Sequence, residues 1–121
     1  SKAVKASFIA PHTFFYGPDM AANLRATQGH LVHVRLADTY DHNKSSQLRY
    51  IVNPPGSKVR VHQHTDFGQG EIDWDVFFST LADMKFDGVL SNCVFAWEDR
   101  AEDSARFMLS ETKKYLNKYQ K

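Results

Sequence analysis

Hydrophobic and polar residues fall along the chain in blocks that predict short buried strands separated by helices. Residues 4–9 form an apolar, β-compatible run that Pro11 stops, and residues 31–36 form a second run of the same kind. Short apolar runs bounded by turn-forming residues are typical of buried strands. Residues 88–95 form a third run. We therefore expect three buried strands.

Amphipathic helices are predicted between and after these strands. Pro18 and Asp19 suit a first helical turn and Gly29 can close that helix. Its apolar face consists of Met20, Ala21 and Leu24. After Asp73, a potential N-cap, apolar side chains recur with the helical period at Trp74, Phe77, Phe78, Leu81 and Met84. A last helix is predicted from a stripe of Ala105, Met108, Leu109, Thr112, Leu116 and Tyr119.

A long polar connection interrupts this alternation. Residues 37–58 contain a rigid Pro-Pro turn and exceed the usual length of a βα loop, and such loops are usually functional. Residues 59–64 are expected to form a short extended piece within it. The resulting order, βα-β-loop-α-βα, is the signature of a parallel sheet with right-handed crossovers.

Composition limits the class of protein. The chain has 121 residues, 42% of them hydrophobic, which predicts one folded domain over residues 1–121. The formal net charge of +1 argues against nucleic-acid and membrane-surface partners, because both require a basic excess. No apolar run approaches the about 20 residues that span a bilayer. The single Cys93 fits a reducing compartment, so we expect a cytoplasmic protein.

The most informative motif lies in residues 59–74. His62 and His64 are two residues apart, so in an extended segment both would project from one face and could hold one metal ion or polar ligand. Gly68 and Gly70 allow a sharp turn and a close backbone approach directly after them. This pattern predicts a binding site.

Several segments carry a resemblance to a known family. The sequences Leu31-Val-His-Val-Arg-Leu-Ala-Asp38, Gly68-Gln-Gly-Glu-Ile-Asp-Trp74 and Phe86-Asp-Gly88 resemble the C-terminal part of xylose-isomerase-like TIM barrels. That superfamily holds sugar and sugar-phosphate isomerases and epimerases, together with zinc-dependent apurinic-site endonucleases. Residues 49–56, 60–64 and 95–98 look most like the isomerase-type protein of myo-inositol catabolism. The resemblance implies metal-assisted proton transfer next to the carbonyl of a sugar or cyclitol-derived small molecule.

The resemblance implies a partial barrel, because a complete (β/α)8 barrel needs about 250 residues. We expect an α/β fold: the C-terminal portion of a TIM barrel, about three βα units, with parallel strands and flanking helices. Three strands cannot close a barrel and leave edges open for pairing. The chain is therefore interpreted as a fragment or an engineered piece, with a subunit that completes itself by association as the alternative, and a homo-oligomer is expected.

The resemblance also implies a divalent metal, manganese, zinc or cobalt, bound by Glu, Asp and His at the carboxyl ends of the strands. His12 matches a histidine of the family pattern. Three ligand positions depart from the pattern, because Ile9 stands for an Asp, Arg35 for a His and Cys93 for a Glu.

Two hypotheses follow from these departures. In the first, His62, His64 and His12 bind a metal in a rearranged site that Cys93 or Asp38 completes. In the second, the chain binds no metal and is a non-catalytic barrel fragment or scaffold. We favour weak or absent metal binding, because the permanent charge of Arg35 repels a divalent cation.

The remaining candidates are assigned by position and chemistry. Asp38, at the end of a strand, and Glu98 are candidate catalytic carboxylates. Candidate substrate-binding residues are His12, His33, Arg35, Arg49 and Arg60, the arginines because a guanidinium can bind a phosphate or carboxylate with two hydrogen bonds. Each has a structural alternative: a hydrogen-bonded core histidine for His33, a cap for Asp38 and surface ion pairs for the arginines.

Overall fold

The computed structural model describes residues 2–40 and 64–119. Its centre is a parallel three-stranded sheet in the order β1-β2-β3. The strands are β1 (Ala6–Ile9), β2 (Leu31–Leu36) and β3 (Val89–Asn92). The expected parallel α/β arrangement is therefore confirmed. Arg49, Arg60 and His62 lie outside the described residues, as does all but His64 of the extended piece expected at residues 59–64.

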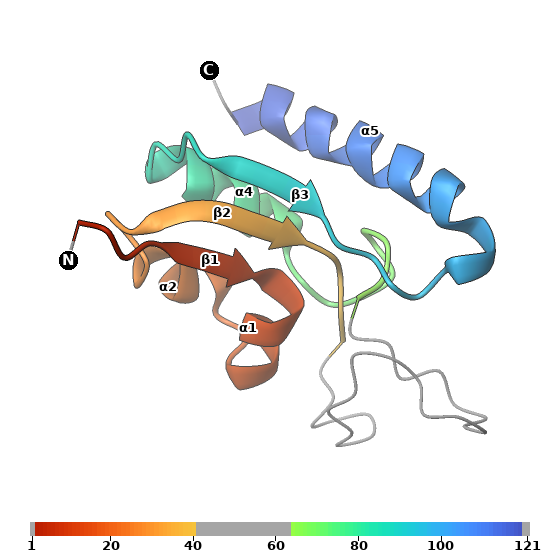
Figure 1. The fold of residues 1–121 in the computed structure, drawn as a ribbon, viewed down its shortest axis with the longest axis horizontal. Helices are drawn as coiled ribbons and strands as arrows, with labels where there is room; N and C mark the ends of the chain where they lie inside the picture. The colour runs from red at the N-terminus through yellow and green to blue at the C-terminus, as the bar shows by residue number, and fades with distance from the viewer. Residues whose placement is uncertain (1, 41–63, 120–121) are drawn as a thin grey trace.

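Helices cover one face of this sheet. They are α1 (Ala10–Tyr16), α2 (Met20–Arg25), α4 (Trp74–Asp83), the short 3-10 helix η1 (Glu98–Arg100) and α5 (Ala101–Tyr119). In Figure 1, α2 and α4 lie behind the sheet, α5 lies beyond β3, and α1 continues from the carboxyl end of β1. The face of the sheet that is turned toward the viewer has no described helix over it. We call it the open face.

Helix α1 was not predicted, because Pro11 was interpreted as a stop. Proline does end strand β1, but it also suits the first helical turn, where its missing N–H has no partner to lose and its fixed φ is already helical. The helix begins at Ala10 with Pro11 in its first turn. The Thr13 hydroxyl donates a hydrogen bond of 2.9 Å back to the carbonyl of Ile9.

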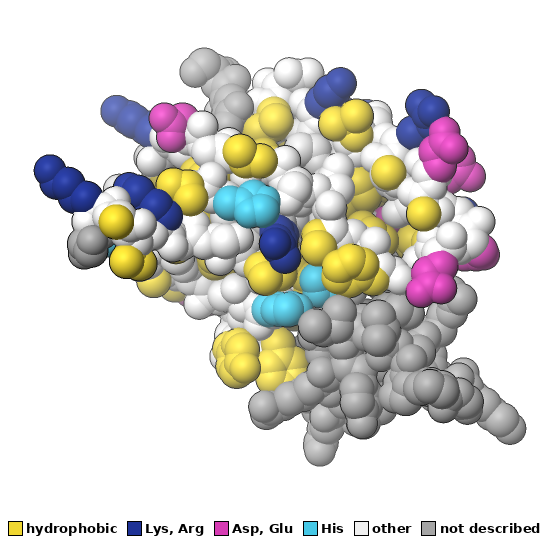
Figure 2. Space-filling view, viewed as in Figure 1, with side chains coloured by type: hydrophobic (Ala, Val, Ile, Leu, Met, Phe, Trp, Pro, Cys, Tyr) yellow, Lys and Arg dark blue, Asp and Glu magenta, His cyan; other side chains and the backbone are white. Residues whose placement is uncertain are grey.

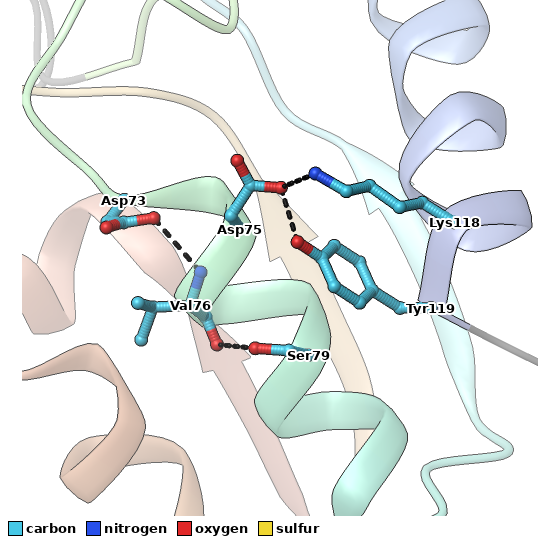
Figure 3. Close-up of polar contacts among 6 residues, drawn as sticks. All are labelled: Asp73, Asp75, Val76, Ser79, Lys118 and Tyr119. Carbon is cyan, nitrogen blue, oxygen red and sulfur yellow. Dashed lines mark hydrogen bonds and ion pairs between the residues drawn. The ribbon is translucent and has the colours of Figure 1, made fainter.

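The two predicted helix starts are confirmed. The Asp19 carboxylate accepts a hydrogen bond of 2.9 Å from the N–H of Ala22, and the Asp73 carboxylate accepts one of 3.0 Å from the N–H of Val76. A carboxylate at this position satisfies a backbone donor and complements the helix dipole. Figure 3 shows the Asp73 cap at the start of α4.

The core lies between the sheet and these helices. Phe8, Val34 and Leu36 project from the strands into it, and the predicted aromatic stripe of α4 is buried there. The rings of Phe78 and Tyr115 stack with centroids 4.8 Å apart, which joins α4 to α5. Because side chains alternate along a strand, the neighbours of these core residues, among them His33 and Arg35, lie on the open face.

The last third of the chain differs from the prediction in two respects. Strand β3 is shorter than the expected residues 88–95 and is not fully buried, since the side chain of Val89 is 63% exposed. Helix α5 buries Ser104, Met108 and Thr112, whereas Leu109 of the predicted stripe is half exposed and Ala105 is exposed. An edge strand buries less than a central one, and a neutral serine or threonine can enter a core when its hydroxyl is hydrogen-bonded.

A polar contact on the surface joins the two long helices. One carboxylate oxygen of Asp75 in α4 accepts hydrogen bonds from the Lys118 ammonium at 2.7 Å and from the Tyr119 hydroxyl at 2.5 Å (Figure 3). These bonds lower the pKa of Asp75, the Lys118 bond most, and raise the pKa of Lys118. Asp75, Lys118 and Tyr119 are called the α4–α5 tether below.

No helix within the two described stretches combines the length and the apolar character that crossing a membrane requires.

Candidate functional site

The candidate site lies at the carboxyl ends of the three strands. In a parallel sheet these ends meet at one edge, where ligands of α/β folds bind. His12 follows β1, Arg35 lies near the end of β2, and Cys93 follows β3. The segment that begins at His64 crosses the same edge: the carbonyl of His64 accepts bonds of 3.2 Å from the N–H groups of Phe95 and Ala96, directly after β3.

Two histidines from distant parts of the chain face each other there. The Nε2 atoms of His12 and His64 are 3.1 Å apart, and the two rings meet edge to face. The Nδ1 atom of His64 lies 2.7 Å from the carbonyl oxygen of Cys93. A carbonyl can only accept, so Nδ1 of His64 carries a proton and, in the neutral pair, its Nε2 accepts from Nε2 of His12. His64 is only 2% exposed and packs against the ring of Phe95.

Arg35 supplies positive charge to this edge of the sheet. Burial lowers the pKa of His12, and the charge of Arg35 lowers it further. Burial also raises the pKa of the Cys93 thiol, an effect that Arg35 partly offsets. Both imidazole and thiol are therefore held toward their neutral forms.

His33 lies further back on the open face and is held from both sides. Its Nε2 lies 2.7 Å from the Ser91 hydroxyl of β3, and its Nδ1 lies 3.2 Å from the Ser7 hydroxyl of β1. The side chain thus joins all three strands. Both of the predicted roles for His33, a structural histidine and a substrate ligand, are compatible with this position, and neither is tested.

Asp38 lies just beyond β2 and is almost fully buried. Its carboxylate accepts hydrogen bonds from three backbone N–H groups, those of Thr39 at 2.9 Å, Gly68 at 2.9 Å and Ile72 at 3.3 Å. Its backbone also exchanges two bonds with Thr65. A Cβ atom at Gly70 would overlap this carboxylate and the backbone of Thr39. The Gly-x-Gly segment therefore wraps closely around Asp38, and a catalytic role for this carboxylate stays a prediction.

Sequence reasoning did not single out Asp66. Its carboxylate is 3% exposed, accepts a hydrogen bond from the Ser104 hydroxyl, and forms an ion pair of 3.2 Å with Arg100. It anchors the loop that carries His64 to the start of α5. An Asp two residues before Gly68 is a turn signal, but its partners are more than 30 residues away in the sequence.

Glu98 opens η1 and is exposed. Among the described residues it forms no ion pair with the histidine pair. The 3-10 helix η1 leads directly into α5, which begins at Ala101. The role of Glu98 as a catalytic carboxylate is untested.

The described residues do not by themselves fit the divalent metal that the resemblance implied. His64 shares one feature with many metal ligands, a ring nitrogen that donates to a carbonyl, but its other ring nitrogen contacts His12. No group of three or more His, Cys, Asp or Glu side chains within residues 2–40 and 64–119 could hold a metal ion. Asp38 and Asp66 are occupied by hydrogen bonds, and Arg35 opposes a cation.

A groove of the described structure lies elsewhere. It has a volume of about 720 Å³ and is lined by the end of α4, the start of β3 and α5, with Phe86, Leu90 and Leu116 among its apolar residues. It sits at the amino end of β3, the end that contributes to stability in barrels of this kind. The geometry of the titratable groups therefore locates the candidate site better than the size of the cavity does.

Comparisons with known proteins agree with the fold. The solved structure of a D-tagatose 3-epimerase-like protein superimposes with a TM-score of 0.67 at 20% sequence identity. The match covers 97% of this chain and 36% of that structure, so the chain spans about a third of its length. No curated protein sequence matches the chain. The profile of the family described as "Xylose isomerase-like TIM barrel" matches residues 1–111. The chain belongs to the xylose isomerase-like TIM barrel family.

Proposed function

We propose that this chain is part of the active-site end of a sugar isomerase or epimerase. Its family and its structural neighbour, a D-tagatose 3-epimerase-like protein, support this assignment. The observation that carries it is the histidine pair at the carboxyl ends of the strands, where active sites of TIM barrels lie. A cyclitol-derived substrate from inositol catabolism is the finer proposal, and it rests on the sequence resemblance alone.

The reaction class requires a proton to move at the carbon next to a carbonyl. If Nδ1 of His12 accepts the substrate proton, the proton on its Nε2 can pass to Nε2 of His64, which becomes the imidazolium while its Nδ1–H stays bonded to the carbonyl of Cys93. His12, whose pKa is lowered, is available as a proton acceptor near neutral pH. Asp38 and Glu98 are the proposed carboxylates of the complete site.

The test is exchange of substrate hydrogen with solvent. The chain is incubated with D-tagatose, or with an inosose, in D2O, and deuterium at the carbon next to the carbonyl is followed by NMR. We expect slow exchange that His64→Gln lowers by about tenfold or more, while Ser79→Ala on the surface of α4 leaves it unchanged. Exchange that survives in the His64 variant would place the chemistry elsewhere.

A non-catalytic fragment is the second candidate function. The observation that favours it is that both buried carboxylates of this edge, Asp38 and Asp66, are consumed by structural hydrogen bonds. Complete absence of exchange in wild type and variants would support it.

A further inference from the structure

The open face of the sheet carries a cation that has no counter-charge in the described structure. Arg35 is exposed and, in the parallel register, lies between Ile9 of β1 and Ser91 of β3. None of the ion pairs or hydrogen bonds among residues 2–40 and 64–119 involves its guanidinium. Figure 2 looks onto this face, where a basic side chain lies near the middle between histidine side chains, and the other basic and the acidic side chains lie toward the margins.

The neighbours of Arg35 do not supply the missing charge. His12 and Cys93 are the titratable groups that respond to Arg35, and both are held toward their neutral forms. The nearest buried carboxylate along the chain, Asp38, has its oxygens turned to three backbone N–H groups.

A hydroxyl lies on the open face in register with Arg35, that of Ser91 on the neighbouring strand β3. His33 contacts the hydroxyls of Ser7 and Ser91 through its two ring nitrogens. A neutral imidazole has one N–H and one lone pair, so it donates to one serine and accepts from the other. The serine that accepts keeps its own O–H free to donate. Of the two serines, Ser91, at the shorter contact of 2.7 Å, is itself the register partner of Arg35.

The family membership indicates where Arg35 would lie in a complete barrel. In a closed TIM barrel the face opposite the helices is the interior, where an arginine without a partner is strongly unfavourable. The guanidinium carries five donors in a planar fork that matches the oxygens of a phosphate or a carboxylate.

We propose that Arg35 binds an oxyanion, the phosphate or carboxylate group of the ligand. The hydroxyl of Ser91, which His33 orients, binds the same oxyanion. The site is built to hold an anion, in contrast to the divalent cation expected from the resemblance. The assignment of this anion to a sugar substrate rests on the proposed function. The binding of an anion by Arg35 is independent of it.

The direct test is calorimetric titration of the chain with inorganic phosphate at low ionic strength. Arg35→Gln is compared with Arg106→Gln, which removes the same charge from the surface of α5, where Arg106 pairs with Glu102 at 2.6 Å. We expect Arg35→Gln to weaken binding by about tenfold and Arg106→Gln to leave it within about twofold. Equal weakening in the two variants, or no phosphate binding by the wild type, would overturn the proposal.

Two further variants keep the result independent of folding defects. Arg35→Lys retains the charge without the planar fork and should bind phosphate at an intermediate strength. Ser91→Ala should weaken binding by about threefold, while Ser79→Ala should not.

Competition of phosphate with a hexose 6-phosphate and with gluconate then separates a phosphorylated ligand from a sugar acid. Phosphate binding that depends on Arg35, without any hydrogen exchange in sugars, would support the anion site and reject the proposed function.

Discussion

Asp38 shows how a single residue can look catalytic in the sequence and be structural in its contacts. It stands at the end of β2, where barrel enzymes place reactive groups, yet its carboxylate is bound by the N–H groups of Thr39, Gly68 and Ile72. The last two donors come from residues about 30 positions later, so no local pattern predicts them. The cap at Asp73 was predictable because its partner, Val76, is three residues away.

These contacts predict the cost of changing Asp38. In Asp38→Asn the amide places an NH2 group against backbone donors, so one buried bond is lost and one donor is left unpaired. We expect a loss of about 2 kcal/mol in the free energy of unfolding, measured by urea denaturation. Asp87→Asn, at an exposed position, is the matched control and should stay within about 0.5 kcal/mol. Unchanged stability in Asp38→Asn would show that the carboxylate is not holding the loop.

A substitution at Gly70 tests the packing of the same loop against Asp38. A Cβ atom there would overlap the carbonyl of Thr39 and the carboxylate of Asp38, and backbone cannot move away cheaply. We expect Gly70→Ala to destabilise the chain by about 2 kcal/mol or more. Gly17→Ala is the control, because Gly17 has extended backbone with a φ of −178° and no heavy atom within 4 Å of its potential Cβ. Its effect should be neutral or slightly stabilising.

At the scale of elements, the periodicity of apolar residues predicted which face of a strand or helix is buried in the core. Strand β2 and the aromatic face of α4 were predicted because each buries apolar side chains in the core, Val34 and Leu36 from β2 and Trp74, Phe77 and Phe78 from α4. The helix α1 was missed because Pro11 is compatible with both a strand end and a helix start. Helix α5 buries Ser104 and Thr112, since their hydroxyls reach Asp66 and the carbonyl of Met108, and hydrophobicity alone carries no signal for such pairs.

The α4–α5 tether predicts a dependence of stability on pH. The folded pKa of Asp75 is lowered from 3.8, so its contribution is complete above that pH and is lost as the pH falls through the folded value. The folded pKa of Lys118 is raised from 10.5, so its contribution is complete below that pH and is lost as the pH rises further. Between these limits the tether stabilises the packing of α5.

Asp75→Asn should therefore unfold at lower urea concentration than the wild type at about pH 7, and the gap should narrow as the pH falls below 3.8 and through the lowered pKa of Asp75. The gap should also shrink in about 1 M salt, because Asp75 and Lys118 are more than half exposed. Asp83→Asn, which removes the exposed partner of Arg25, controls for the loss of one surface charge. A gap that is constant down to low pH would contradict the assignment.

At the scale of the whole molecule, the sheet formed by the described residues has three strands and two edges. Within the described residues β1 and β3 each pair only with β2, and β3 exposes Val89. The sequence predicted this incomplete barrel from its length, because three βα units are fewer than the eight that close the fold. It could not predict what covers the edges, since that depends on surfaces that meet only after folding.

Symmetry limits how copies of this chain can complete one another. Pairing the β3 edge of one copy with the β1 edge of the next is a head-to-tail contact, which either closes a ring or continues as a filament. Eight is not a multiple of three, so identical three-stranded copies cannot reproduce an eight-stranded barrel. We therefore expect association of the isolated chain to increase with protein concentration and to give no single barrel-like species, as measured by light scattering.

Val89→Lys is the variant that tests this expectation. A lysine on an exposed edge strand disfavours pairing with another sheet at little cost to the fold, so it should lower the average mass at a given concentration. Val76→Lys, at the 42% exposed Val76 on α4, makes the same substitution on the helical side and should leave association unchanged. A wild-type chain that stays monomeric across the concentration range would show that its edges are covered by its own residues. If both lysines lower the average mass equally, the cause is the added net charge, because a contact at the edge of the sheet would be affected at Val89 and not at Val76.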